Sequence, residues 1–506
     1  MTNERWWRGM VAGPAWPLGS YLALAFLLRL PAVLWAGGFE HPDQQFQSID
    51  PAYHVATGGA WHEPWEFRDR SRSWCYPEAL AMLFRLLAAV GLEEPGPTMM
   101  AVRAVHALLS LLPVWLFWLV LVKWQPVRES RLPLLLFALS GLPLASVQAG
   151  GGPVAATLAV AAGLALAGRG PFPALAGLCL GFAFVCRFQD ALFGPAFLTV
   201  LLVQRRWAAS AWFALGCLPG IVVQGVSDLA AGGPFLGTVW RYVDTNIGGN
   251  DAANAWRTQP LPFYLYAGVV PVLALLPWPS VLRAAWARLR AGSAVLPAAV
   301  AGAIVHVVVF SFVPRKALRF EQPAFVLLFA VLLAGFAVAR GNGASWHARA
   351  LVAVHVGWWL LASSWFGNAG AVGLAEWLRR QPDWRGEVVV LDGDATSLGG
   401  FFYSRPPADQ VVSARRSELA AVRARAAPFL VVIRDPLTAA ELTALGDYAL
   451  AASFQGRFDL RAGERRYVYR RRARARRGRV TCRSRRASAS RRPSGPRPSS
   501  ASPRLR

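Results

Sequence analysis

Residues Ala104 to Val122 read AVHALLSLLPVWLFWLVLV, an apolar run without a lysine, arginine, aspartate or glutamate. A helix that spans a bilayer needs roughly 17–25 mainly apolar residues, and this run is long enough. Comparable runs lie along most of the chain: Ser20–Trp35, Leu132–Val147, Val154–Ala167, Pro173–Cys186, Ala191–Val203, Ala208–Leu229, Leu261–Trp278, Val295–Val313, Pro323–Ala339 and Leu351–Trp365. The sequence therefore predicts an α-helical polytopic membrane protein with about eleven transmembrane helices.

The composition of the 506-residue chain excludes an ordinary cytosolic enzyme. Only 16% of the residues are charged and 55% are hydrophobic, whereas a soluble chain carries about a quarter charged residues. The net charge of +25 suggests a nucleic-acid partner, but fifteen arginines and no acid lie in residues 470–506, which leaves +10 for the rest. We expect a disordered Arg/Ser/Pro-rich tail at 470–506 that contacts anionic lipid or polymer, and no specific nucleic-acid partner.

The basic residues of the short connections set the expected orientation. With the N-terminus in the cytoplasm, alternate connections carry most of the Lys and Arg, as the positive-inside rule requires. The segments 36–99, 148–153, 187–190, 232–260 and 314–322 then lie on the outer side. Ala-, Arg- and Gly-rich usage favours a bacterial cytoplasmic membrane, or the endoplasmic reticulum membrane if the chain is eukaryotic. Five cysteines without a CxxC pattern predict neither a zinc site nor a disulfide framework.

A different composition begins after Trp365. Glu387–Leu391, Phe401–Tyr403 and Phe429–Ile433 read as short strands, and Ser417–Ala427 and Leu437–Leu450 read as helices. We therefore expect a transmembrane domain at 1–366, with a large first outer loop at 36–99, and a small outer α/β domain at 385–469.

The first outer loop combines aromatic and charged residues. Up to Pro77 it holds three Trp, two Tyr, three Phe and three His beside several acids and arginines. Aromatic rings with a few charges suit sugar binding at the level of the lipid headgroups, although a well-packed loop with surface ion pairs is the alternative. Asp43 follows Pro42 just beyond the first apolar run, where a carboxylate can accept a proton from a hydroxyl or merely form a turn or cap.

Further polar residues on the outer side are candidates for binding. Arg315, Lys316 and Arg319 lie within five residues, against the positive-inside trend, and such cations hold a phosphate or anchor the interface. Arg187 and Asp190 are interpreted as a structural pair, with a place in the same site as the alternative. Single histidines within apolar runs are interpreted as core residues: His106, His306 and His355.

Two motifs resemble those of the glycosyltransferase family 22 mannosyltransferases. His41-Pro-Asp-Gln-Gln-Phe-Gln47, with Trp65-Glu-Phe67, Arg72-Ser73 and Tyr76-Pro77, resembles the family's HPDE-x-(F/W)-Q, TWEW and R-S-x-x-x-P loop. Arg315-Lys-Ala-Leu-Arg-Phe-Glu-Gln-Pro323 is similar to its H-K-E-x-R-F-x-x-P motif. The chain departs from these patterns at Gln44, Pro64, Phe67, Arg315 and Ala317. The resemblance covers roughly residues 15–340.

The resemblance implies a GT-C fold and transfer of a sugar, usually mannose, with inversion from a polyprenyl-phosphate donor to a glycan or glycolipid acceptor. Asp43 would be the base, and the donor phosphate would bind Lys316 and Arg319 with Arg315 or Arg72. The other residues implied in substrate binding are His41, Gln44, Gln47, His54, Trp65, Glu66 and Asn246. A donor without pyrophosphate lessens the need for Mg²⁺, so we expect no metal and no cofactor.

Two alternatives from other classes stay open. A transporter or flippase for lipid-linked sugars would also use aromatic and cationic groups, and it predicts an internal repeat. A membrane scaffold that displays the outer domain is the second alternative.

Overall fold

The computed structural model describes residues 16–39, 41–59, 61, 63–124, 130–140, 148, 150–166, 171–248, 259–266, 283, 286–287, 295–313, 316–339, 346–364, 368–384, 387–393, 395–405, 410–455 and 465–472. Residues 1–471 form one compact unit, and a second begins at Arg472. The predicted boundary at residue 470 falls within a strand, since Arg470 and Arg471 belong to β5 (Arg466–Arg471).

Apolar helices occupy the predicted runs that the structure describes. They are α2 (Leu18–Leu27), α3 (Leu30–Trp35), α8 (Pro95–Leu109), α9 (Leu111–Trp124), α10 (Arg131–Leu139), α12 (Gly151–Ala165), α13 (Phe172–Cys186), α14 (Phe193–Val203), α15 (Trp207–Ala230), α20 (Val295–Phe312), α21 (Gln322–Ala339) and α22 (Trp346–Ser364). Among the described residues, three helical segments are long and apolar enough to cross a membrane: Leu18–Trp35, Pro95–Val122 and Trp207–Ala230. Most of Leu261–Trp278 lies outside the described residues, so the number of spans stays a prediction.

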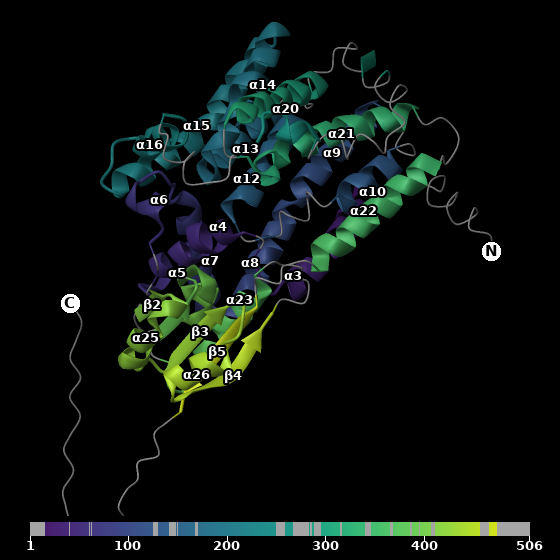
Figure 1. The fold of residues 1–506 in the computed structure, drawn as a ribbon. Coiled ribbons are helices and arrows are strands. Elements are labelled where there is room, and N and C mark those ends of the chain that lie inside the picture. The colour runs from purple at the N-terminus through teal and green to yellow at the C-terminus, as the bar shows by residue number, and fades with distance from the viewer. Residues whose placement is uncertain are drawn as a thin grey trace, which may run out of the picture. The chain divides into compact units, whose positions relative to one another are not determined.

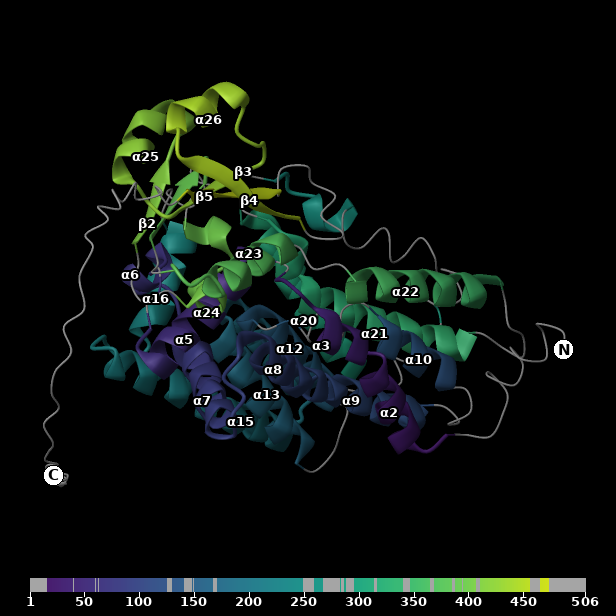
Figure 2. The same ribbon diagram turned by 90° about the horizontal axis from the view of Figure 1, so that it is seen from below.

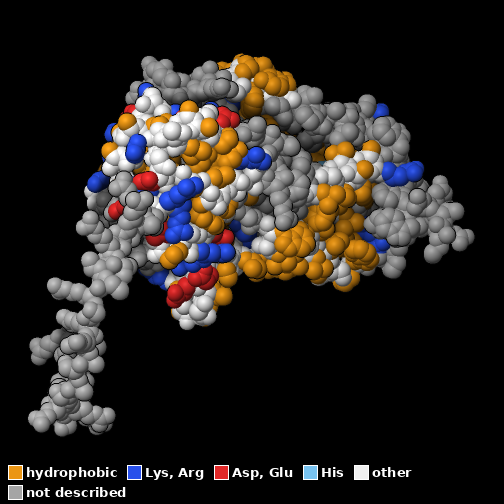
Figure 3. Space-filling model, turned by 60° about the horizontal axis from the view of Figure 1, so that its bottom comes forward, with side chains coloured by type: hydrophobic (Ala, Val, Ile, Leu, Met, Phe, Trp, Pro, Cys, Tyr) orange, Lys and Arg blue, Asp and Glu red, His pale blue; other side chains and the backbone are white. Residues whose placement is uncertain are grey.

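Figure 3 shows one face of the molecule, on which charged side chains gather at the left and hydrophobic side chains cover much of the other described surface. Helix α15 illustrates the apolar part, because a stripe along it is between 48% and 55% exposed: Trp212, Leu215, Leu218, Val222, Val226 and Leu229. Apolar surface of this extent is unfavourable in water and favourable against lipid. The fold is therefore that of a membrane protein.

Helices α13 and α15 pack backbone against backbone. A Cβ atom on Gly177 would lie 2.0 Å from the carbonyl oxygen of Phe213, and one on Gly220 would lie 2.2 Å from that of Gly181. Gly216 and Gly220, four residues apart, face Ala174 and Gly181 in the same way. Small residues at this spacing let two helices approach closely within a membrane. This contact fixes α13, which ends one residue before Arg187.

The connection between the first two apolar segments is largely helical. It contains α4 (Pro42–Gln44), a π-helical turn η1 (Gln45–Ile49), α5 (Asp50–Thr57), α6 (Trp65–Arg68) and α7 (Cys75–Ala89). Figure 1 shows these helices between the apolar bundle and the C-terminal sheet. Their buried side chains, among them Phe46 and Tyr76, form one cluster with residues of α23 (Ala369–Arg379) and α24 (Phe401–Ser404).

A five-stranded sheet lies near the C-terminus, with the order β2 (Gln410–Ala414), β1 (Glu387–Leu391), β3 (Phe429–Ile433), β5 and β4 (Tyr448–Phe454). Strand β1 is parallel to β2 and β3, and β5 is antiparallel to β3 and β4. Alternate residues of β1 face opposite sides, where α23 covers one face and α25 (Leu419–Arg425) and α26 (Ala439–Leu445) cover the other (Figure 2).

Two local predictions for this region are wrong. Phe401–Tyr403 is not a strand but part of α24, because left-handed turns at Gly399 and Gly400 (φ +83° and +95°) redirect the chain just before it. The helix expected over Leu437–Leu450 is only α26, which ends at Leu445 before β4 begins at Tyr448. Strands β1 and β3 have the predicted bounds, whereas the domain boundaries at residues 366 and 385 stay predictions.

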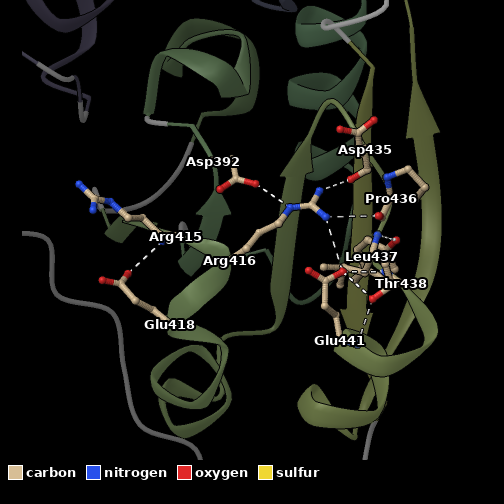
Figure 4. A network of polar contacts seen from close by, with 10 residues as sticks. Asp392, Arg415, Arg416, Glu418, Asp435, Pro436, Leu437, Thr438 and Glu441 are labelled. Atoms are coloured by element: carbon tan, nitrogen blue, oxygen red, sulfur yellow. Dashed lines mark hydrogen bonds and ion pairs between the residues drawn. The ribbon is translucent and has the colours of Figure 1, made fainter.

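A polar network ties together the loops after β1, β2 and β3 (Figure 4). Nε of Arg416 donates to Oδ2 of Asp392 at 2.7 Å, and Nη1 lies 3.5 Å from Oε2 of Glu441. Thr438 and Glu441 form a capping box at the start of α26. Arg416 therefore links the loops that follow these three strands.

Candidate active site

A cavity of about 460 Å³ lies where the first outer connection meets the ends of several apolar helices. Its walls come from the connection between His41 and Pro77, the start of α12, the end of α13 and the start of α21. Helix α16 (Gly237–Val243) and the π-helical turn η3 (Asp244–Gly248) supply a further wall. Nine of the predicted site residues line it: His41, Asp43, Gln44, Gln47, Trp65, Glu66, Arg72, Asn246 and Arg319.

Asp43 and Arg319, far apart in sequence, form an ion pair within the cavity. Nη2 of Arg319 lies 2.9 Å from Oδ2 of Asp43. Asp43 is in the first turn of α4, and Nδ1 of His41 lies 3.2 Å from its Oδ1. Burial raises the pKa of the Asp43 carboxyl, but hydrogen bonding by His41 and the charges of Arg319 and Arg72 outweigh it, so the pKa lies well below its ordinary value. Asp43 is therefore ionised and paired with Arg319.

Amide side chains organise the wall beside this pair. Nε2 of Gln47 donates to Oε1 of Glu66 at 2.6 Å, and Nε2 of Gln44 donates to Oε1 of Gln148 at 2.7 Å. Gln44 thus contacts a neutral amide at the position where the related motif carries a glutamate. Glu66 is a second carboxylate of the cavity and lies next to Trp65, a ring on which a sugar can stack.

Asn246 belongs to the turn η3 and lines the part of the cavity that α16 and η3 form. Its Nδ2 donates to the carbonyl oxygen of Tyr242 at 2.9 Å, and the Gln189 amide nitrogen donates to the Tyr242 hydroxyl at 2.8 Å. This region therefore offers amide and hydroxyl groups to the cavity, as sugar hydroxyls require.

Two predicted site residues that the structure describes, His54 and Lys316, do not line the cavity. Nδ1 of His54 lies 2.7 Å from the carbonyl oxygen of Gly59, and its ring stacks on Trp61. Nζ of Lys316 donates to the carbonyl oxygen of Gln259 at 3.0 Å, and burial lowers the pKa of this lysine. Arg315 lies outside the described residues.

Arg187 and Asp190 do not form the pair expected from the sequence. Asp190 instead lies 3.5 Å from Nε2 of His306, and Nδ1 of His306 lies 2.8 Å from Oε2 of Glu321. All three side chains are fully buried, and the His306 ring is stacked between Phe193 and Phe310. His306 is thus a core residue that joins two helix ends, while Arg187 lines the cavity.

Sequence reasoning also missed the glycine-rich start of α12. Gly150, Gly151 and Gly152 line the cavity, although the segment 148–153 carries no charge or aromatic ring that would mark a site. The signal available was the glycine run itself, which permits close approach of the backbone to a neighbour.

Backbone groups of α24 bind Asp50, close to the segment that carries Asp43. Oδ2 and Oδ1 of Asp50 accept hydrogen bonds from the backbone N–H groups of Phe401 and Phe402 at 3.1 and 3.0 Å, and Gln45 donates to Oδ1 at 2.7 Å. Burial raises the pKa of Asp50 to about 6 despite these donors. Since Asp50 directly follows the π-helical turn that begins beside Gln44, this contact fixes the segment that carries Asp43.

The described residues contain no group of three or more His, Cys, Asp or Glu side chains suited to a metal ion. The site is thus a mixed set of arginines, carboxylates and amides around one cavity, with apolar helices on the side opposite the sheet.

A family model described as the Alg9-like mannosyltransferase family matches residues 20–372. The chain belongs to this family. The resemblance predicted from the two motifs is therefore confirmed. The match includes the first outer connection and the segment around Arg319, which together enclose the cavity.

Curated relatives match a short part of the chain. GPI mannosyltransferase 3 of Trypanosoma brucei brucei is 34% identical over 97 residues, which are 19% of this chain and 17% of the relative. GPI mannosyltransferase 3 of Drosophila melanogaster is 30% identical over 112 residues, 20% of each chain. The chain thus matches only about a fifth of the length of these relatives.

Solved structures share the fold. ArnT from Cupriavidus metallidurans, solved bound to undecaprenyl phosphate, superposes with a TM-score of 0.57 at 15% identity, over 89% of this chain and 97% of ArnT. The Archaeoglobus fulgidus oligosaccharyltransferase gives a TM-score of 0.50 at 11% identity, over 82% and 68% of the two chains. Both are GT-C glycosyltransferases, so this chain has a GT-C-like fold.

Proposed function

We propose that the protein is a membrane glycosyltransferase that transfers a sugar, mannose in the first instance, from a polyprenyl-phosphate donor to a lipid-linked or surface glycan. The observation that carries this proposal is the Asp43–Arg319 pair at 2.9 Å in a cavity of about 460 Å³. Family membership supports the sugar, and the undecaprenyl phosphate bound to ArnT, which shares the fold, supports the lipid donor.

In the proposed reaction the acceptor hydroxyl oxygen attacks the anomeric carbon from the face opposite the phosphate. The carbon–oxygen bond to the phosphate breaks, and the phosphate leaves with the electron pair as polyprenyl phosphate. The hydroxyl proton passes to Asp43, which is therefore the general base. Attack opposite the leaving group inverts the configuration at the anomeric carbon, as in inverting glycosidases.

Arg319 has two roles in this proposal. Without donor it neutralises Asp43, and with donor its guanidinium also contacts the phosphate and stabilises the charge that develops on the leaving group. A phosphate that shares Arg319 weakens the hold of this cation on Asp43 and makes the carboxylate a stronger base. Arg72 raises the positive charge of the same cavity.

The site supplies groups for the sugar and the acceptor as well. Trp65 offers an aromatic face, and Glu66, Gln47 and Asn246 offer hydrogen-bonding groups. His41 holds Asp43, and Gln44 lies beside it. Lys316 and Arg315 remain predicted donor-binding residues. We propose the bacterial cytoplasmic membrane as the location of the protein.

The test is transfer of radiolabelled mannose from polyprenyl-phosphate mannose by the purified full chain, with a membrane glycolipid extract as acceptor. Asp43→Asn should lower the rate by about 10²–10⁴-fold while undecaprenyl phosphate still binds. Asp383→Asn is the matched control, because Asp383 pairs with Arg470 and does not line the cavity. Wild-type rates in Asp43→Asn would rule out Asp43 as the base. Movement of intact donor across a vesicle membrane without sugar transfer would favour a flippase.

A further inference from the structure

Arg187 lines the cavity beside Arg319. It follows the last residue of α13 in an extended conformation, and its side chain lines the cavity although the residue is only 8% exposed. Nη1 donates to the carbonyl oxygen of Arg319 at 3.0 Å, and the guanidinium carbon is 5.0 Å from the centre of the Phe320 ring. The Gln189 amide, with its oxygen toward Arg187, accepts from Nη2 at 3.0 Å. Arg187 is thus held in a single place by neutral groups.

The charge of Arg187 is not neutralised by a carboxylate among the described residues. Asp190, three residues along the chain, faces His306 instead. A buried guanidinium without an anionic partner is costly unless hydrogen bonds satisfy it or an anion binds. Since Arg187 borders an open cavity, a bound anion can reach it.

A buried bridge fixes the two turns that carry the arginines. Asp190 belongs to the 3₁₀ turn η2 (Phe188–Leu192), and Glu321 directly follows the turn η5 (Leu318–Phe320) that contains Arg319. His306 of α20 contacts both carboxylates. The separation of Arg187 and Arg319 is therefore set before any ligand binds, as a preorganised anion site requires.

The N-terminus of α12 adds a third element. Helix α12 has fifteen residues, and the cavity is lined by Gly150, Gly151 and Gly152 at its start. A Cβ atom on Gly152 would lie 3.9 Å from Nη1 of Arg187, so the helix start and the guanidinium are adjacent. The positive end of a helix and its free N–H groups bind phosphate groups.

The cavity carries more positive than negative charge. Its cations are Arg72, Arg187 and Arg319, and its carboxylates are Asp43 and Glu66. Arg319 faces Asp43. Arg187 and the start of α12 lie next to Arg319, and Arg187 has no carboxylate partner in the described part of the chain.

We propose that Arg187 and the glycine-rich start of α12 bind the phosphate of the lipid donor, with Arg319 between this phosphate and Asp43. The inference rests on the proposed function and adds a phosphate-binding residue that neither motif contains. It places the leaving group beside Arg187 and the acceptor hydroxyl beside Asp43, on the two sides of Arg319. The ligand is a phosphate ester of a polyprenol, and free phosphate would share only its head group.

The experiment measures binding of undecaprenyl phosphate to the purified full chain in detergent, followed by tryptophan fluorescence. Arg187→Gln should weaken the affinity by at least about tenfold, since hydrogen bonds to charged groups are worth that much. Arg187→Lys keeps the charge but loses the forked donors, so its affinity should lie between those of the wild type and Arg187→Gln. Arg380→Gln is the matched control, because its side chain is 70% exposed and does not line the cavity.

Thermal unfolding of each variant separates binding from folding. If Arg187→Gln does not fold, Arg187→Lys carries the comparison, and its weaker binding supports the site. Equal affinity of a folded Arg187 variant and the wild type would overturn the inference. Displacement of the lipid by an equal concentration of inorganic phosphate would overturn the assignment of a lipid ligand.

Sugar transfer distinguishes this inference from the proposed function. If the wild type transfers mannose and Arg187→Gln has an unchanged KM for the donor, the inference fails and the function stands. If undecaprenyl phosphate binds in a manner that depends on Arg187 but no sugar is transferred, the function fails and the phosphate site stands.

Discussion

The packing of α13 on α15 makes Gly220→Ala the most demanding test of the structure. The added methyl group would lie 2.2 Å from the carbonyl oxygen of Gly181, about 1.2 Å less than an ordinary contact of 3.4 Å. Neither atom can rotate away, because one is backbone and the other is bonded directly to backbone. The two helices must therefore separate by about 1.2 Å, at an expected cost of about 1–3 kcal/mol.

The displacement reaches the site, because α13 leads directly to Arg187. A shift of about 1 Å at a catalytic or binding group costs as much as 10²-fold in rate. We expect Gly220→Ala to lower the midpoint of thermal unfolding in detergent and to raise the KM for the lipid donor. Both quantities are measured on the same purified preparation.

Gly357→Ala is the matched control for this substitution. Gly357 lies within α22, and no atom is within 4 Å of a Cβ atom built on it. Alanine is better than glycine within a helix by about 0.5–1 kcal/mol, so this variant should be as stable as the wild type or more stable. If Gly220→Ala unfolds at the same temperature as Gly357→Ala and transfers sugar normally, the close helix contact is wrong.

Three further predictions concern charge. Arg319→Gln should cost more free energy in donor binding and transfer than in thermal unfolding. Kinetics and unfolding measured on one preparation check this. The pKa of Asp50 is raised from 3.8 to about 6 in the folded state, so the contribution of this group to stability is fully present below pH 4 and falls by about 3 kcal/mol as the pH rises through 6. Asp50→Asn should therefore gain stability relative to the wild type between pH 4 and 7, and an unchanged difference would contradict the raised pKa. A chelator such as EDTA should leave transfer unchanged, because a monophosphate leaving group needs no divalent ion; loss of transfer that Mg²⁺ restores would refute this.

The helices were predictable because lipid imposes a length and a composition on each span. Runs such as Ala208–Leu229 agree with α15 to within a residue at each end. The first span was less predictable, since Arg29 is buried between α2 and α3 and donates to the carbonyl oxygen of Ala25 at 2.6 Å. Hydropathy alone does not reveal such a break, because it depends on a partner, Ser110, that is distant in sequence.

The candidate site was predictable where chemistry shows in the residue type. Asp43 and Arg319 were expected to meet, and they lie in one cavity at 2.9 Å. Lys316 looked equivalent to Arg319 in sequence, but its Nζ is directed at the Gln259 carbonyl because a turn of chain separates the two. Gly150–Gly152 were missed, since their contribution is backbone and depends on which helix start faces the cavity.

The hydrogen bonds from Phe401 and Phe402 to Asp50 bear on how this gene can be dissected. The family match ends at residue 372, yet the carboxylate behind the first outer connection depends on two amides some thirty residues further on. A shortened open reading frame that stops at the homology boundary would remove these two backbone donors and leave Asp50 with Gln45. Expression plasmids and deletion alleles that aim to keep the site should therefore extend through Arg471, where β5 ends.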